Sequence, residues 1–119
     1  MNVVITGASR GIGFELVKCF LSNGHKVLAI SRNEKQLQYL KDEGANTLAF
    51  DLSETDFTPI RLELSKMESI DILINNAGVL VNKPFSQLTD TEIKYVYEVN
   101  VFSVFRLIRE MLPYYNQNS

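Results

Sequence analysis

The glycine-rich stretch at residues 6–13, with the sequence TGASRGIG, constrains the fold of this chain more than any other feature. It follows Val3-Val4-Ile5, a short β-branched run typical of a buried strand, and it precedes an amphipathic run from Phe14 to Leu21. A strand, a glycine turn and a helix start in this order form a phosphate-binding site. The first N–H groups of such a helix have no partner within it, and the helix dipole is positive at that end.

The glycine spacing narrows the kind of site. Gly7, Gly11 and Gly13 follow the pattern Gly-x-x-x-Gly-x-Gly. This differs from Gly-x-Gly-x-x-Gly, because Leu16 occupies the place of the third glycine, and from a P-loop, because no Lys-Ser/Thr follows. Glycines let the backbone turn sharply and admit a pyrophosphate that a Cβ would exclude. By itself, the pattern is also compatible with a plain tight turn.

Composition limits the function classes. The chain has 119 residues, enough for one domain with one core, of which 45% are hydrophobic and 22% charged. A net charge of -2 gives no electrostatic reason to expect binding to nucleic acid or to an anionic membrane. No apolar run approaches membrane-spanning length, and no metal site is expected. The single cysteine, Cys19, is expected to be a small buried residue of a helix, and a cytoplasmic location fits this cysteine usage.

Strand and helix patterns alternate along the chain, which favours an α/β fold with a doubly wound parallel sheet. Right-handed crossovers would place the strands in the order 3-2-1-4. We expect these to be strands 1–4 of a longer Rossmann-type sheet. The expected strands cover residues 2–6, 26–31, 46–50 and 71–75, and the expected helices cover 11–23, 34–43, 58–67 and 91–112.

Polar signals mark the starts of these helices. Asn33, with a glutamine three residues on, and Thr89, with a glutamate three residues on, are typical N-caps. Thr58 is expected to cap the third helix, because Pro59 follows it at the first helical position. In such a sheet a ligand lies across the carboxyl ends of strands one and four. The glycine turn follows strand one and Asn75-Asn76-Ala77-Gly78 follows strand four, so both motifs are expected at that edge.

Together, the glycine turn and the Asn-Asn-Ala-Gly motif resemble the short-chain dehydrogenase/reductase family. The resemblance covers the whole chain but only the N-terminal part of that family's fold. The form of both motifs is similar to its compact, 3-oxoacyl-reductase-like branch. The resemblance implies an NADP(H)-dependent oxidoreductase that acts on a small carbonyl or alcohol. Residues 1–119 would be its cofactor-binding domain, incomplete at the C-terminal end.

The end of the second strand bears on cofactor choice. Many dinucleotide-binding folds place an acid there to hold the 2′-hydroxyl, whereas this chain has Ser31-Arg32. A guanidinium can hold a 2′-phosphate through charge-assisted, bidentate hydrogen bonds. With Arg10 in the glycine turn as a second cation, this favours NADP(H) over NAD(H). The alternative is two solvated surface arginines, and Glu34 is close enough in sequence to weaken the preference.

Further site residues come from the resemblance. It implies that Asp51 accepts a hydrogen bond from the adenine, whereas the alternative is a turn residue at a strand end. It also implies that Asn100 holds a water of the proton relay, whereas the alternative is an amide bonded to a neighbouring carbonyl. The expected cofactor-binding set is Gly7, Ser9, Arg10, Gly11, Ile12, Gly13, Ser31, Arg32, Asp51, Leu52, Asn76, Ala77 and Gly78.

The chain departs from the family in its catalytic residues. The family acts through a Ser and a Tyr-x-x-x-Lys, whereas Tyr114-x-x-x-Asn118 and Tyr115-x-x-x-Ser119 both lack the lysine. Neither tyrosine is therefore expected to be a catalyst, and the chain by itself is expected to be an inactive fragment. Two alternatives remain open. One is a non-catalytic nucleotide-binding or sensor module, and the other is a subunit completed by a second chain.

The expected helix at 91–112 is apolar on more than one face, more than one sheet contact requires. Members of the resembled family commonly pair through this helix, so a homo-oligomer is expected. The alternative is a stripe that the rest of the family fold buries. Ile93, Val96, Tyr97, Val104, Leu107, Ile108 and Met111 form one stripe, and Tyr95, Val99, Phe102 and Phe105 widen it.

Overall fold

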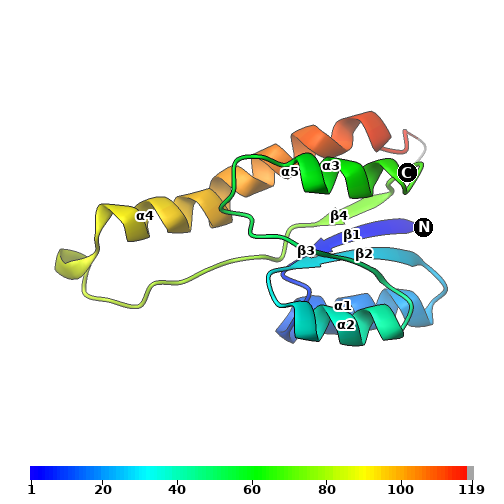
Figure 1. The fold of residues 1–119 in the computed structure, drawn as a ribbon, viewed down its shortest axis with the longest axis horizontal. Helices are drawn as coiled ribbons and strands as arrows, with labels where there is room; N and C mark the ends of the chain where they lie inside the picture. Colours follow the sequence, from blue (N-terminus) through cyan, green and yellow to red (C-terminus); the bar gives the residue numbers. More distant parts are fainter. Residues whose placement is uncertain (118–119) are drawn as a thin grey trace.

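A computed structural model of the chain describes residues 1–117, so Asn118 and Ser119 lie outside the described residues. It shows one parallel four-stranded sheet in the order β3-β2-β1-β4, which confirms the predicted topology (Figure 1). In register, Val3 of β1 is opposite Val27 of β2 on one side and Ile72 of β4 on the other. The strands are β1 (Asn2–Thr6), β2 (Lys26–Ser31), β3 (Asn46–Ala49) and β4 (Ile72–Ile74).

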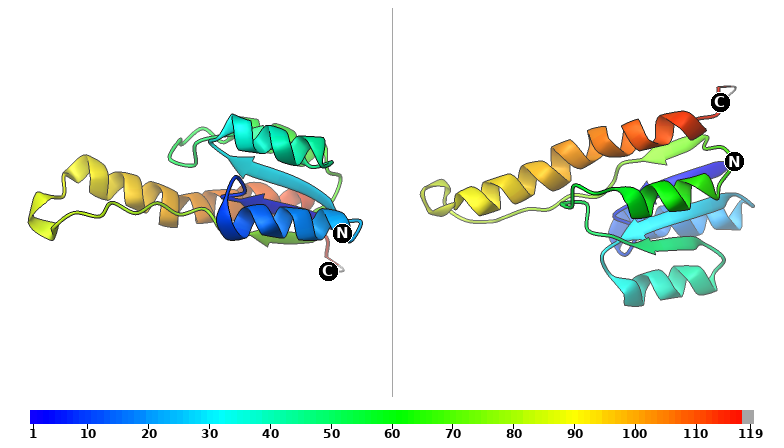
Figure 2. Two further views of the ribbon diagram at one scale, coloured as in Figure 1. Left: turned by 90° about the horizontal axis from the view of Figure 1, so that it is seen from below. Right: turned by 45° about the horizontal axis from the view of Figure 1, so that its top comes forward.

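Helices cover both faces of the sheet, so alternate strand residues build two cores (Figures 1 and 2). On one face lie α1 (Gly11–Ser22) and α2 (Glu34–Asp42), and on the other lie α3 (Thr58–Ser65) and α5 (Ser103–Met111). Val3, Ile5 and Val27 pack with Val17, Leu37 and Leu40 in the first core. Val4, Leu28 and Ile30 pack with Ile60, Leu64, Leu107 and Met111 in the second. The central strands are nearly continuous apolar runs because both of their faces are buried.

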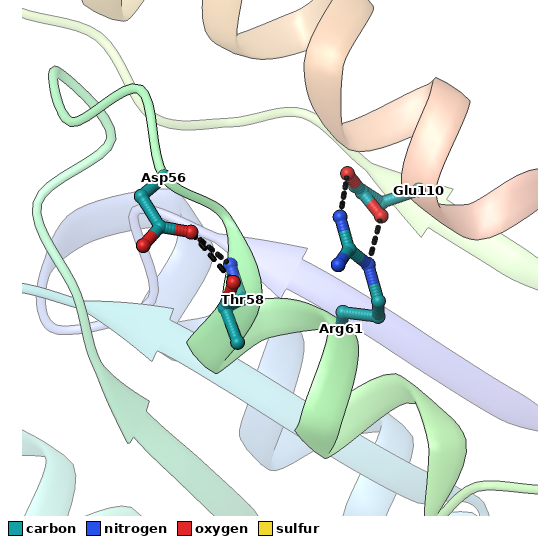
Figure 3. A network of polar contacts seen from close by, with 4 residues as sticks. All are labelled: Asp56, Thr58, Arg61 and Glu110. Atoms are coloured by element: carbon teal, nitrogen blue, oxygen red, sulfur yellow. Dashed lines mark hydrogen bonds and ion pairs between the residues drawn. The ribbon is translucent and has the colours of Figure 1, made fainter.

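Two of the three predicted caps are confirmed. The Asn33 side chain accepts a hydrogen bond from the Gln36 N–H, and Thr89 and Glu92 form a capping box at α4 (Asp90–Tyr97). The prediction for Thr58 was wrong by one residue, because Phe57 occupies the N-cap of α3 without a side-chain cap. Asp56 provides the hydrogen bonds at this end instead, since its carboxylate accepts from both the hydroxyl and the N–H of Thr58 (Figure 3). These two bonds keep the pKa of Asp56 below its usual value.

The prediction for Cys19 was also wrong. The residue is exposed on α1. Its position along the helix places it with Glu15, Lys18 and Ser22, whereas the buried face carries Gly13 and Val17. A helix turns by 3.6 residues, so a position two residues beyond Val17 lies on the opposite side.

The single long helix expected at 91–112 is instead divided into α4, η2 (Glu98–Phe102) and α5, and its last residue, Leu112, begins the turn η3 (Leu112–Tyr114). Between α4 and α5, η2 is a π-helical turn. A π turn inserts one extra residue into the helix and shifts the phase of the side chains that follow. Two contacts join η2 to α5. Arg106 and Glu98 form an ion pair of 2.6 Å, and the Ser103 hydroxyl donates a hydrogen bond to the Val99 carbonyl. A further short turn, η1 (Phe85–Gln87), precedes α4.

An ion pair fixes α5 to α3 (Figure 3). Nε and Nη2 of Arg61 each donate to one carboxylate oxygen of Glu110, both at 2.9 Å. The hydrogen bonds from Arg61 hold the pKa of Glu110 below its usual value. Since α4 and η2 lead directly into α5, this contact helps to set where those two segments lie.

The outer edge of β4 begins to pair with the segment after η3. Ile70 and Tyr115 form a parallel bridge, in which the Ile70 N–H donates to the Tyr114 carbonyl at 2.8 Å. Ile70 precedes β4, so this bridge lies at the amino edge of the sheet. The segment at Tyr115 and Asn116 therefore lies near the start of β1, at the edge opposite the glycine turn. Both tyrosines are thus remote from the carboxyl edge, where the sequence places the ligand.

Candidate functional site

A cleft of about 330 Å³ opens at the carboxyl edge of the sheet, where the winding of the chain reverses. It lies among the glycine turn, the ends of β2 and β3, the segment after β4, and α4 with η2. The sequence predicted this location from the positions of its two motifs. Of the expected cofactor-binding residues, those that line the cleft are Gly7, Ser9, Arg10, Gly11, Ser31, Arg32, Asp51, Leu52, Asn76, Ala77 and Gly78.

The glycine turn needs its glycines for different reasons. Gly7 and Gly11 have φ values of +63° and +58°, in the left-handed region that other residues rarely adopt. A Cβ on Gly7 would also lie 2.8 Å from the Ala77 Cα, whereas Gly11 faces open space. A bound phosphate could therefore approach the backbone closely at Gly11.

Two expected residues do not line the cleft. Gly13 is buried in the first turn of α1, where a Cβ would collide with the Gly7 carbonyl and the Asn76 amide. It therefore lets the helix pack against the turn. Ile12, also in the first turn of α1, is 73% exposed and is not among the residues that line the cleft.

The start of α1 is open to an anion. Arg10 is its N-cap in extended conformation, no side chain caps this end, and the first turn holds no acidic residue. The guanidinium of Arg10 forms no hydrogen bond or ion pair within residues 1–117. The N–H groups and the positive end of the dipole thus face the cleft without a competing carboxylate.

Hydrogen bonds tie the end of β4 to the glycine turn. The hydroxyl of Thr6, a residue only 1% exposed, accepts from the N–H groups of Asn76 and Ala77 at 3.1 and 3.0 Å. The Asn76 side chain donates to the Gly7 carbonyl at 3.1 Å. The motif therefore braces the sheet at the cleft. Sequence reasoning did not single out Thr6, although a lone hydroxyl at the end of an apolar strand is the signal for such a role.

Asp51 makes a local contact. Its Oδ1 accepts from the Ser53 N–H at 2.9 Å, so the turn interpretation describes what this oxygen does. The residue is half-buried and lines the cleft, and its other oxygen has no partner in the described part of the chain. One carboxylate oxygen thus remains for a ligand. The neighbouring Leu52 is buried and contributes an apolar wall.

Arg32 reaches across the cleft to α4. Its Nη1 donates to the hydroxyl of Tyr95 at 2.7 Å, although the two residues are 63 positions apart. Glu34 does not neutralise this guanidinium, because no ion pair joins them in residues 1–117. Ser31 faces the same cleft, and its hydroxyl accepts weakly from the Asn33 N–H at 3.3 Å.

Asn100 occupies the π turn and bonds to the segment that follows Gly78. Its Oδ1 accepts from the Val79 N–H at 2.8 Å, and its Nδ2 donates to the Val79 carbonyl at 2.9 Å. The amide therefore does what the alternative interpretation expected, since it bonds to a neighbouring carbonyl. Both ends of the side chain are engaged, so it fixes the wall of the cleft. Its expected role with a relay water stays a prediction.

Five lining residues were missed by the sequence analysis of the site. Tyr95 and Val99 lie four residues apart on one helix face, yet they were assigned to an apolar stripe. Their role depends on where α4 and η2 pass, which no local pattern indicates. The others are Ile30, Phe50 and Val79, each next to an expected site residue.

Within residues 1–117, no three or more His, Cys, Asp or Glu side chains gather as they would around a metal ion. None of the helices in this part of the chain has the length and apolar character needed to cross a membrane.

Comparison with known proteins places the chain in a family. At 38% identity, the chain is similar to an uncharacterized oxidoreductase, YvrD, of Bacillus subtilis, with 93% of this chain and 44% of the relative covered. It is 34% identical to the 3-oxoacyl-[acyl-carrier-protein] reductase FabG of Escherichia coli, with 92% and 47% covered. The chain thus spans less than half the length of both relatives.

Solved structures agree with this placement. A metagenomic short-chain oxidoreductase in complex with NADP superimposes with a TM-score of 0.83 at 30% identity, covering 95% of this chain and 55% of that one. A 4-hydroxyisoleucine dehydrogenase complexed with NADH gives 0.84 at 33% identity, with 92% and 47% covered. The family described as short chain dehydrogenase matches residues 1–119, and the chain belongs to that family.

Proposed function

We propose that this chain is the cofactor-binding part of an NADP(H)-dependent oxidoreductase that interconverts a carbonyl and an alcohol of a small molecule. The observation that carries the cofactor choice is Arg32, which lines the cleft at the end of β2 and pairs with no carboxylate of residues 1–117. An acid at this position would repel a 2′-phosphate, whereas a guanidinium attracts one. The names of relatives support the reaction class, and solved neighbours include complexes with NADP and with NADH.

The residues of the cleft fit a dinucleotide. The uncapped start of α1 would hold the pyrophosphate over Gly11, and the guanidiniums of Arg10 and Arg32 would hold the 2′-phosphate. The free oxygen of Asp51 and the apolar side chain of Leu52 would contact the adenine. Ala77 and Gly78, which offer little side-chain bulk, would leave room for a ribose. When bound, the cofactor supplies or accepts the hydride.

We propose that Asn100 supports catalysis indirectly, because it positions a segment that borders the cleft. Its paired hydrogen bonds to Val79 hold the segment after β4 in place beside the cleft. Each end of the amide makes one hydrogen bond there and keeps a second hydrogen-bonding position, which a relay water would use. Asn100 would thus shape the part of the cleft that lies beside the segment after β4.

We further propose that residues 1–119 bind a nucleotide but transfer no hydride. The sequence holds no Tyr-x-x-x-Lys, and Tyr114 and Tyr115 lie at the opposite edge of the sheet from the cleft. A positioned acid contributes about 10²–10⁴-fold to such a reaction. Expression of this segment with NADPH and a set of ketones and aldehydes tests the proposal. Saturable NADPH oxidation that survives Tyr114→Phe and Tyr115→Phe would contradict it.

Arg32→Asp tests the cofactor choice. The substitution removes a charged hydrogen-bond donor and adds a repelling carboxylate, so the binding free energy of NADPH should weaken by about 1–3 kcal/mol, with a smaller change for NADH. Titration calorimetry measures both. Lys26→Asp makes the same charge change at the other end of β2 and should leave the ratio of the two affinities unchanged. Equal affinities for NADPH and NADH before mutation would refute the preference.

We also propose a homo-oligomer that uses the surface of the helix at 91–112. Apolar side chains form an exposed stripe along it, and such a stripe marks an interaction surface. Light scattering should show an oligomer that Phe105→Glu dissociates, whereas a monomer at high concentration would contradict the proposal. The exposed fractions are 54% for Tyr97, 45% for Phe102, 68% for Phe105, 38% for Ile108 and 62% for Leu112.

A further inference from the structure

The hydrogen bond between Arg32 and Tyr95 has no counterpart in the function proposed so far. Tyr95 lies on α4, is half-buried and lines the cleft together with Arg32. Its hydroxyl lies 2.7 Å from Nη1 of the guanidinium. The phenol therefore holds an exposed arginine at the adenosine end of the cleft, near Asp51 and Leu52.

The pair presents hydrogen-bond donors only. A guanidinium has five N–H donors, and the bond to Tyr95 uses one of them. The phenol accepts that bond, which leaves its own O–H as a donor, because it has no other partner in residues 1–117. An anion placed between the two groups would thus receive N–H and O–H bonds together, each strengthened by the charge of the anion.

Fixing the guanidinium also changes the entropy of binding. A free arginine side chain populates many rotamers, and part of this freedom is lost when a phosphate fixes it. Tyr95 already limits the rotamers of Arg32 before a ligand arrives, so less entropy remains to be lost. Dinucleotide folds place the adenosine ribose at the end of the second strand, where Arg32 is found.

From this geometry we infer that Tyr95 sets the preference of the cleft for an adenosine that bears a 2′-phosphate. It positions the Arg32 guanidinium and donates its own O–H to the phosphate. Tyr95 is therefore a specificity-determining residue of the site. This inference rests on the proposed use of NADP(H), and it adds a residue from α4 to the recognition of the phosphate.

Two probes that differ only in the 2′-phosphate test it, namely adenosine 2′,5′-bisphosphate and 5′-AMP. Tyr95→Phe keeps the ring and removes the hydroxyl, so its affinity for the bisphosphate should fall about tenfold, the size of one hydrogen bond to a charged group. Its affinity for 5′-AMP should change less than about twofold. Tyr39→Phe, at a half-exposed tyrosine of α2 outside the cleft, should change neither affinity. Thermal unfolding confirms that each variant is folded.

The ratio of the two affinities separates the possible failures. If the unmodified protein binds both probes equally, the proposed NADP(H) preference is wrong. If it prefers the bisphosphate and Tyr95→Phe keeps that ratio, the role of Tyr95 is wrong while the cofactor preference stands. A parallel loss of both affinities in Tyr95→Phe would show that the hydroxyl only supports the fold of the cleft, and it would overturn the inference as well.

Discussion

The two walls of the cleft are held by different kinds of contact. On the phosphate side, the end of β1, the glycine turn and the end of β4 are joined by backbone groups that a buried Thr6 and the Asn76 amide connect. On the helical side, α4 and η2 are held by two exposed side chains, because Arg32 bonds to the Tyr95 hydroxyl and Asn100 bonds to the Val79 backbone. The first wall therefore tolerates little change in sequence, whereas the second can vary without loss of the fold.

This difference matches two tasks of a dinucleotide site. A pyrophosphate is the same in every nicotinamide cofactor, so the wall that holds it can be fixed by the backbone. Discrimination between cofactors or substrates requires particular side chains. These lie in the wall that backbone hydrogen bonds constrain least. Substitutions in the two walls test that division, beginning with the largest expected effect.

Gly13→Ala should be the most damaging. The new Cβ would collide with the Gly7 carbonyl, a backbone atom that cannot move without shifting the whole turn. We expect a loss of about 3 kcal/mol in the free energy of unfolding, at the upper end for overpacking, together with the loss of nucleotide binding. Urea unfolding measures the first and calorimetry the second.

Gly78→Ala is the matched control, because its Cβ would lie 3.6 Å from the Asn100 Oδ1, an ordinary contact. It should cost less than about 1 kcal/mol. Equal stability of the two variants would show that the turn is less constrained than its geometry indicates.

Thr6→Val should come next. Valine matches the shape of threonine but leaves the N–H groups of Asn76 and Ala77 without their acceptor in a buried place. An unsatisfied buried donor costs about 1–3 kcal/mol. Thr47→Val, on β3, is the control because the Thr47 side chain forms no hydrogen bond within residues 1–117. A loss no larger than that of the control would mean that water replaces the hydroxyl.

The first wall is also the part that the sequence predicted best. The strands, their order, the glycine turn and the Asn-Asn-Ala-Gly motif all depend on local signals, namely β-branched runs, glycines and helix caps. The π turn does not, because Asn100 stabilises it through Val79, a residue that becomes its neighbour only in the fold. The role of Tyr95 was missed for the same reason, since a partner 63 residues away leaves no trace in a local pattern.

Asn100→Leu tests the second wall. It removes both hydrogen bonds to Val79, but the site is exposed and water can replace them. We therefore expect a loss of only about 1 kcal/mol in the free energy of unfolding. Hydrogen exchange at the Val79 amide should rise much more than exchange in β1. Asn100→Asp keeps the acceptor for the Val79 N–H and should show a smaller rise, whereas unchanged exchange in both variants would argue against a fixed segment.

The smallest effect concerns the anchor of α5 and depends on pH. Hydrogen bonds from Arg61 depress the pKa of Glu110, so the folded state favours its charged form (Figure 3). Such a group contributes its full stabilisation above its unfolded pKa of about 4.3 and loses it as the pH falls through the lower folded value. Hence the stability difference between the unmodified protein and Glu110→Gln should be constant from about pH 7 to pH 5 and shrink below about pH 4.

The size of this difference should be small, because the Arg61 side chain is 56% exposed and solvent screens the pair. In an Arg61→Gln background, Glu110→Gln should have a much smaller pH-dependent effect, since the main partner that lowers the pKa of Glu110 is gone and only the weaker charge interaction with Arg109 still favours the charged form. Thermal unfolding from pH 3 to pH 7 measures all four proteins. A pH-dependent difference of the same size without Arg61 would show that other groups depress the pKa of Glu110, and that α5 depends less on α3 than this ion pair indicates.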